Sequence, residues 1–106
     1  MSLGITHSPH EEETMPALLC TRVGPGMRDS ERIVEVKDIQ GRREFLRVPL
    51  GYLEVVGKSY YVPVGLIQED PVQQLALVEL PQEGECGSWR LWVRMADLLP
   101  PLENSA

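Results

Sequence analysis

The chain has little of the side-chain chemistry on which most enzymes depend. Its only two histidines, His7 and His10, lie within the first ten residues. A domain folded from the rest of the chain therefore has no imidazole base for serine- or cysteine-type catalysis. Neither the G-x-G-x-x-G nor the G-x-x-x-x-G-K-[ST] pattern occurs, so the sequence gives no support for nucleotide binding. We expect a protein that is not an enzyme and uses no cofactor.

Carboxylates in pairs are the remaining candidates for acid–base chemistry. The pairs are Glu69-Asp70 and Glu83 with Glu85, and both lie in predicted turns beside proline or glycine. General acid–base catalysis needs a carboxylate desolvated in a cleft, and no sequence feature here indicates one. We interpret these acids as solvated turn residues.

Long apolar runs and cysteines are also scarce. No apolar stretch approaches the roughly 18 residues of a membrane span, and Met1 to Glu13 lacks the apolar core of a secretory signal. We therefore expect a cytoplasmic protein with no membrane partner. The two cysteines, Cys20 and Cys86, are too few for a disulfide framework or a zinc site. We expect free thiols, and a bridge between them is the alternative in an oxidising compartment.

Metal-ligand residue types do cluster near the N-terminus. His7-x-x-His10 is followed by three consecutive glutamates and later by Cys20. Zinc needs three or four ligands fixed around one point, and nothing in this segment would hold them there. A solvated tail is the favoured interpretation, and we predict no metal site.

Charge is unevenly distributed along the 106 residues, whose formal net charge is −6. Residues 1–16 hold three acids and no lysine or arginine, and they predict a disordered leader. Residues 17–99 hold twelve acids against ten bases and form the expected single domain. Residues 100–106 are expected to be a frayed tail. Overall acidity makes nucleic acid an unlikely partner, although a local basic patch remains open.

Residues 17–99 show strand patterns separated by short turns. Residues 32–38 alternate, with Val34 and Val36 on one face and Glu35 and Lys37 on the other. Pro63 cannot donate to a strand ladder, so its strand is either at an edge or broken there. Extended segments are predicted over 17–23, 32–38, 42–48, 59–68, 75–80 and 89–94, with helical turns in 49–57 and 95–99.

This order of elements predicts an all-β, mainly antiparallel fold. We expect a small, partly open β-barrel or roll of about five strands with one or two short helical turns. In strand count and turn spacing, residues 17–99 resemble the small open barrels of the Src-homology-3 or PRC-barrel type. No family signature accompanies this architectural resemblance.

Two of the predicted strands place an aromatic side chain between two arginines. Residues spaced by two share a face of a strand, and the opposite faces here carry aliphatic core candidates. Arginines are almost never fully buried without a partner, so their face should be the outer one. Arginine and aromatic residues are enriched at binding hot spots, and they also stack bases and hold phosphates. The residues are Arg43, Phe45 and Arg47 in one strand, and Arg90, Trp92 and Arg94 in the other.

Three interpretations of this pattern are open. The six residues can form a ligand surface, or the arginines can simply cover the aromatic rings on a solvated wall. Alternatively, the register is shifted by one residue, and Phe45 or Trp92 belongs to the core. Our leading hypothesis is a non-catalytic protein-interaction or assembly module that holds a protein partner or a second copy of itself. The alternative is a single-strand nucleic-acid-binding small barrel, which requires the two strands to be neighbours.

Overall fold

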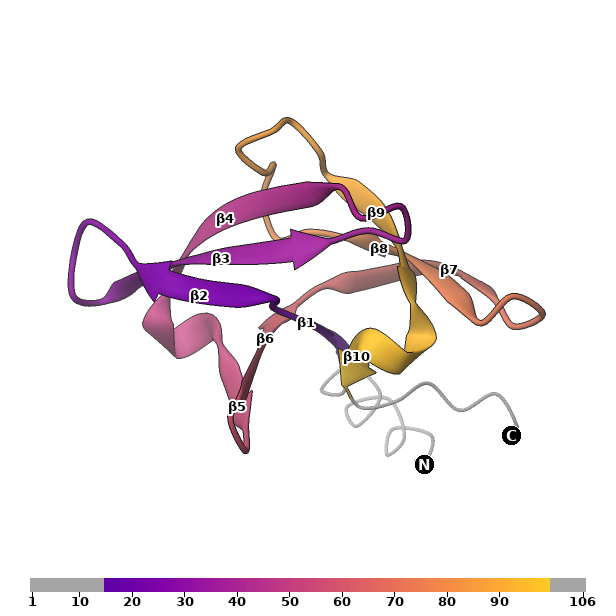
Figure 1. Cartoon of the computed structure of the whole chain (residues 1–106), viewed down its shortest axis with the longest axis horizontal. Helices are drawn as coiled ribbons and strands as arrows, with labels where there is room; N and C mark the ends of the chain where they lie inside the picture. The colour runs from indigo at the N-terminus through magenta and orange to yellow at the C-terminus, as the bar shows by residue number, and fades with distance from the viewer. Residues whose placement is uncertain (1–14, 100–106) are drawn as a thin grey trace, which may run out of the picture.

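A computed structural model describes residues 15–99 (Figure 1). The predicted tail, and the predicted leader apart from its last two residues, lie outside this range, as do His7 and His10. The described chain forms ten strands and two short 3-10 turns. They are β1 (Ala17–Leu19), β2 (Arg22–Pro25), β3 (Glu31–Lys37), β4 (Arg43–Pro49), η2 (Leu50–Tyr52), β5 (Glu54–Val56), β6 (Ser59–Pro63), β7 (Gly65–Asp70), β8 (Leu75–Glu79), β9 (Arg90–Arg94), η3 (Met95–Asp97) and β10 (Leu98–Leu99).

The strands pair into three sheets, and every pairing is antiparallel. The sheet orders are β10-β1-β6-β5, β2-β3-β4 and β7-β8-β9. The prediction of an all-β antiparallel fold is confirmed. The predicted barrel or roll is not confirmed, because residues 15–99 form three sheets and no closed barrel.

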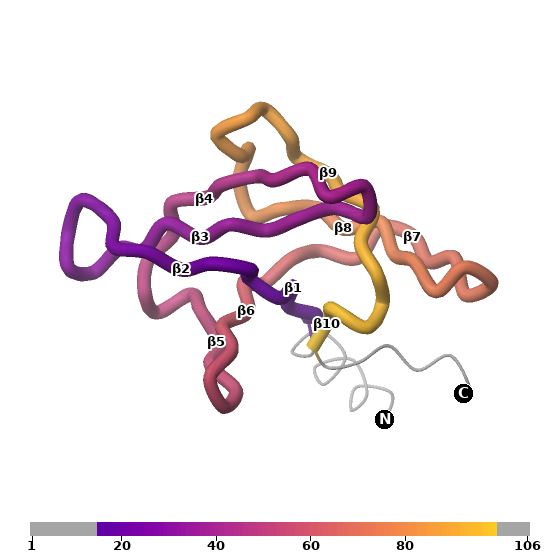
Figure 2. The backbone as a smooth tube through the Cα atoms, viewed as in Figure 1, coloured from indigo at the N-terminus to yellow at the C-terminus, as the bar shows by residue number. Residues whose placement is uncertain are grey.

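Two segments of the chain pass from one sheet into the next, as the tube in Figure 2 shows. Between β1 and β2, the Cys20 N–H donates to the carbonyl of Tyr60 at 2.9 Å, and the Thr21 N–H donates to the carbonyl of Glu35 at 2.8 Å. Between β6 and β7, the Val64 N–H donates to the carbonyl of Pro16 at 3.0 Å. The predicted extended segments 17–23 and 59–68 are therefore each divided into two strands.

Aliphatic side chains from the three sheets form one core. Val34 and Val36 have no exposed surface, as their alternation with charged residues predicts. On β4 the buried residues are Glu44, Leu46 and Val48, and on β9 they are Leu91 and Val93. The core also contains Leu18, Cys20, Val62, Val64, Ala76, Val78, Leu80, Met95 and Leu98.

The predicted helical turns over 49–57 are wrong for most of that segment. Only Leu50–Tyr52 forms a 3-10 turn, and Glu54–Val56 is strand β5, which pairs with β6. Val55 and Val56 are β-branched and favour extended backbone. Gly57, at φ 61°, lies in the β5–β6 hairpin turn rather than at the end of a helix.

Candidate functional site

The structure places the six predicted site residues where strand alternation puts them. Phe45 and Trp92 are half-buried, and the four arginines beside them are exposed. Their strands, however, lie at the edges of two different sheets, and no ladder joins β4 to β9 within residues 15–99. The link between them is indirect, because the Ile39 N–H in the β3–β4 turn donates to the carbonyl of Trp92 at 2.9 Å. The function of these six residues as a binding surface remains a prediction.

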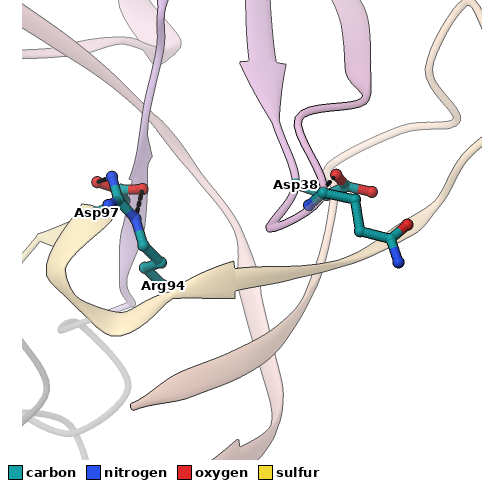
Figure 3. A network of polar contacts seen from close by, with 4 residues as sticks. Asp38, Arg94 and Asp97 are labelled. Carbon is teal, nitrogen blue, oxygen red and sulfur yellow. Dashed lines mark hydrogen bonds and ion pairs between the residues drawn. The ribbon is translucent and has the colours of Figure 1, made fainter. Parts of the chain in front are cut away.

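Two of the four arginines have carboxylate partners within the fold. Arg43 lies 3.6 Å from a Glu35 oxygen. Arg94 donates from Nε and Nη2 to the two carboxylate oxygens of Asp97, both at 3.3 Å (Figure 3). These contacts support the interpretation that Arg43 and Arg94 pair with acidic side chains of the protein itself.

Glu35 lies on the opposite face of β3 from Val34 and Val36, as alternation predicts, yet its side chain is only 5% exposed. The Thr21 hydroxyl donates to its Oε1 at 2.7 Å, and Arg43 covers its other oxygen. The hydrogen bond from Thr21 is the main cause that holds the pKa of Glu35 below its ordinary value, and the nearby cations Arg43, Arg22 and Lys37 add to it against the effect of burial. Strand alternation predicts the face of the sheet on which a side chain lies. It does not predict which other side chains will cover it there.

A groove of about 470 Å³ lies where segments from distant parts of the chain meet. Three of its side chains are large, apolar and about half exposed: Met15 at 54%, Tyr52 at 51% and Trp89 at 49%. Its volume is within the usual range of ligand pockets. The complete lining is Met15, Tyr52, Pro63, Val64, Gly65, Glu79, Leu80, Pro81 and Trp89.

Backbone hydrogen bonds fix the walls of this groove. The bond from Val64 N–H to the Pro16 carbonyl holds Met15 beside the junction of β6 and β7. The 3-10 turn of η2, closed by the Leu53 N–H on the carbonyl of Leu50 at 3.1 Å, carries Tyr52. The Leu80 N–H donates to the carbonyl of Trp89 at 2.7 Å, so the two ends of the β8–β9 loop are joined at the groove.

A buried carboxylate holds that loop in place. Glu44 is 1% exposed, and its oxygens accept backbone N–H bonds from Phe45 at 2.9 Å, Cys86 at 2.7 Å and Ser88 at 2.9 Å. Burial of the carboxyl group opposes its ionisation, but these three hydrogen bonds outweigh it and hold the pKa of Glu44 below its ordinary value. The loop also pairs with β4 directly, through the Glu85 N–H and the carbonyl of Phe45 at 2.9 Å.

A smaller hollow of about 280 Å³ contains two carboxylates, Asp38 and Asp97. Asp38 Oδ1 accepts the backbone N–H groups of Gln40 and Arg42 at 2.8 and 2.9 Å and so closes the β3–β4 turn. Asp97 forms an ion pair with Arg94. Figure 3 shows that this pair and Asp38 lie on separate elements. Each carboxylate thus has a structural partner of its own.

The structure gives no metal cluster and no membrane helix in the part of the chain that it describes. Within residues 15–99, no three His, Cys, Asp or Glu side chains are grouped so that they could hold an ion. No helix among these residues is long and apolar enough to cross a bilayer. Cys20 is buried and Cys86 is exposed, and both are free thiols.

Sequence reasoning missed Trp89, Tyr52 and Glu44. Trp89 was expected to be the first residue of the strand over 89–94, but β9 begins at Arg90. The indole therefore does not follow the alternation of β9, and it lies half exposed in the groove. For Glu44 a signal existed, because alternation along β4 puts this acid on the same inward face as Leu46 and Val48. An acid at an inward position indicates a buried carboxylate that needs hydrogen-bond donors.

Comparison of the chain with known protein families, with curated proteins and with solved structures found no match.

Proposed function

We propose that the chain is a non-catalytic protein-interaction module that holds a short segment of a partner protein in the groove of Met15, Tyr52 and Trp89. The observation that carries the proposal is the convergence of three half-exposed apolar side chains on one hollow. Aromatic residues and methionine are enriched at interfaces, and buried aromatic anchors supply much of the binding energy there.

The position of the groove supports the same conclusion. Its walls come from the segment before β1, from η2, from the β6–β7 junction and from both ends of the β8–β9 loop. Backbone hydrogen bonds and the buried Glu44 fix these walls, so a ligand would meet a preformed surface. Preorganisation lowers the entropic cost of binding.

We also infer that the three sheets form a partly open roll. The continuous segments through Cys20-Thr21 and Val64 connect the sheet of β1 to the other two sheets. The edges β4 and β9 are bridged by the β3–β4 turn and by the β8–β9 loop. Such a roll would bring the edge strands β4 and β9 together beside the groove.

Selection of a random heptapeptide display library on the purified full chain tests the proposed function. We expect enriched peptides whose binding is lost in Tyr52→Ser and in Trp89→Ser. Val72→Ser is the matched control, because Val72 is 92% exposed in the β7–β8 turn and does not line the groove. If binding instead survives both groove variants and is lost in Arg47→Ala or Arg90→Ala, the predicted arginine–aromatic surface is the docking site and the groove is not.

One observation favours a second candidate, a single-strand nucleic-acid binder that uses the β2-β3-β4 sheet alone, because no ladder joins β4 to β9 within residues 15–99. The outer face of the β2-β3-β4 sheet carries four cations around Phe45, namely Arg22, Lys37, Arg43 and Arg47. Cations beside an aromatic ring are the usual elements of such a surface. Fluorescence anisotropy with an oligo(dT) strand tests this candidate: binding that weakens steeply with salt and is reduced by Arg47→Ala would support it, and no binding at low salt would exclude it.

A further inference from the structure

The groove contains a single charged residue. Among its nine lining residues, which are otherwise mainly aromatic and aliphatic, only Glu79 carries a charge, and this residue is half-buried. The groove therefore presents one negative charge in a mainly apolar surface. A charge in such a setting is screened less than one on an open surface, so it discriminates between ligands of opposite sign.

Within residues 15–99, no cation forms an ion pair with this carboxylate. The ion pairs of residues 15–99 are Arg43 with Glu35 and Arg94 with Asp97. Arg90 lies opposite Glu79 in the β8–β9 register, but it forms no ion pair in the described chain and does not line the groove. Glu79 thus has no ion-pair partner among the described residues, and its carboxylate can accept a cation from a ligand.

The two aromatic side chains favour the same kind of ligand. The faces of tryptophan and tyrosine rings attract an arginine or lysine head group through their quadrupoles. The long aliphatic stem of either residue also covers apolar surface while its head group reaches a carboxylate. Tyr52, Trp89 and Glu79 together supply both parts of such a contact.

Resting on the function proposed above, we propose that the groove takes a peptide segment in which an arginine or lysine stands next to apolar residues. The cationic head group pairs with Glu79, and the neighbouring apolar side chains pack against Tyr52, Trp89 and Met15. An acidic segment of the same apolar content is rejected, because it would place a second carboxylate close to Glu79 in a mainly apolar groove.

The test uses the peptides enriched on the full chain and reads their composition. We expect arginine or lysine in the enriched set, with acidic residues depleted. Synthetic copies in which citrulline, a neutral isostere, replaces the arginine should bind about five-fold more weakly. Trp89 fluorescence in a Trp92→Phe background reports this binding, because Trp89 is then the only tryptophan in the chain.

Charge variants separate this inference from the proposed function. Glu79→Gln should remove the preference for arginine over citrulline, and Glu79→Lys should reverse it towards acidic peptides, while Glu83→Gln on the exposed loop should change nothing. Peptides that need Tyr52 and Trp89 but bind equally with arginine, citrulline or glutamate would overturn the inference and leave the proposed function standing. Enrichment that is independent of Tyr52 and Trp89, or no enrichment at all, would overturn both.

Discussion

Glu44 and Cys86 are separated by 42 residues in the chain, yet the Glu44 Oε1 accepts the backbone N–H of Cys86 at 2.7 Å. This bond joins an inward position of strand β4 to the loop between β8 and β9. The same oxygen also accepts the N–H of Phe45, and the second oxygen accepts that of Ser88. One buried side chain therefore ties a groove-forming loop to the core, and it has several measurable consequences.

Replacement of Glu44 by glutamine should destabilise the protein by about 2 kcal/mol, because hydrogen bonds to a charged group are lost and the amide offers only one acceptor oxygen. Urea unfolding measures the change in free energy. Glu83→Gln, an exposed acid of the same loop, is the control and should be close to neutral. Equal stability of the two variants would mean that Glu44 does not hold the loop.

The contribution of Glu44 should disappear at acidic pH. Its pKa in the folded protein lies below the ordinary value of 4.5, so the ionised form stabilises the fold above that value. This stabilisation is lost as the pH falls through the folded pKa. The stability difference between the natural chain and Glu44→Gln should be constant near neutral pH and shrink below about pH 4.5. A difference that is independent of pH down to about pH 2 would show that the charge of Glu44 has no role.

Gly84 should not tolerate a side chain. A Cβ atom at this position would overlap the Glu44 carboxyl group, which the three backbone hydrogen bonds prevent from moving away. Gly84→Ala should therefore cost roughly 1–3 kcal/mol, as is typical of overpacking. Gly51→Ala is the comparison, since nothing lies within 4 Å of its Cβ position, and it should be neutral or slightly stabilising. Thermal unfolding measures the stability of both variants. Equal midpoint temperatures for the two would contradict the prediction.

Val36→Asp should unfold the domain or destabilise it by several kcal/mol, about the whole stability of a small domain, because the new carboxylate would be buried without a partner. Val36 has no exposed surface, whereas Val55 on the edge strand β5 is 55% exposed. Val55→Asp introduces the same charge and should remain folded. Circular dichroism and urea unfolding distinguish the two, and a stable Val36→Asp variant would mean that β3 faces the other way.

Iodoacetamide should label one cysteine in the native protein and two after denaturation. Burial raises the pKa of Cys20 to about 12, so this thiol is neither ionised nor accessible at neutral pH. Cys86 is exposed and should react first, although partial desolvation and the negative charge of Glu44 raise its pKa and slow the reaction. Mass spectrometry of the labelled peptides identifies the site, and rapid native labelling of Cys20 would contradict its burial.

Local sequence patterns predicted much of the fold. The alternation of β3 placed Val34 and Val36 in the core, and that of β4 and β9 placed their arginines outside with Phe45 and Trp92 beside them. Pro63 marked the point at which β6 ends. Gly41, at φ 83°, lies in the short turn predicted between the extended segments 32–38 and 42–48. These features depend on neighbours within a few residues, so a short window of sequence contains the information.

The sequence by itself thus determined which residues face inward along each strand and where the main turns fall, because both follow from backbone geometry and side-chain alternation. Only the tertiary structure decided which loop supplies donors to the inward carboxylate of Glu44, because Cys86 and Ser88 lie more than forty positions away in the chain. It also decided that Met15, Tyr52, Glu79 and Trp89 line one groove. Packing between distant segments has no local signature, since it depends on the relative placement of whole sheets rather than on the conformation of any one strand.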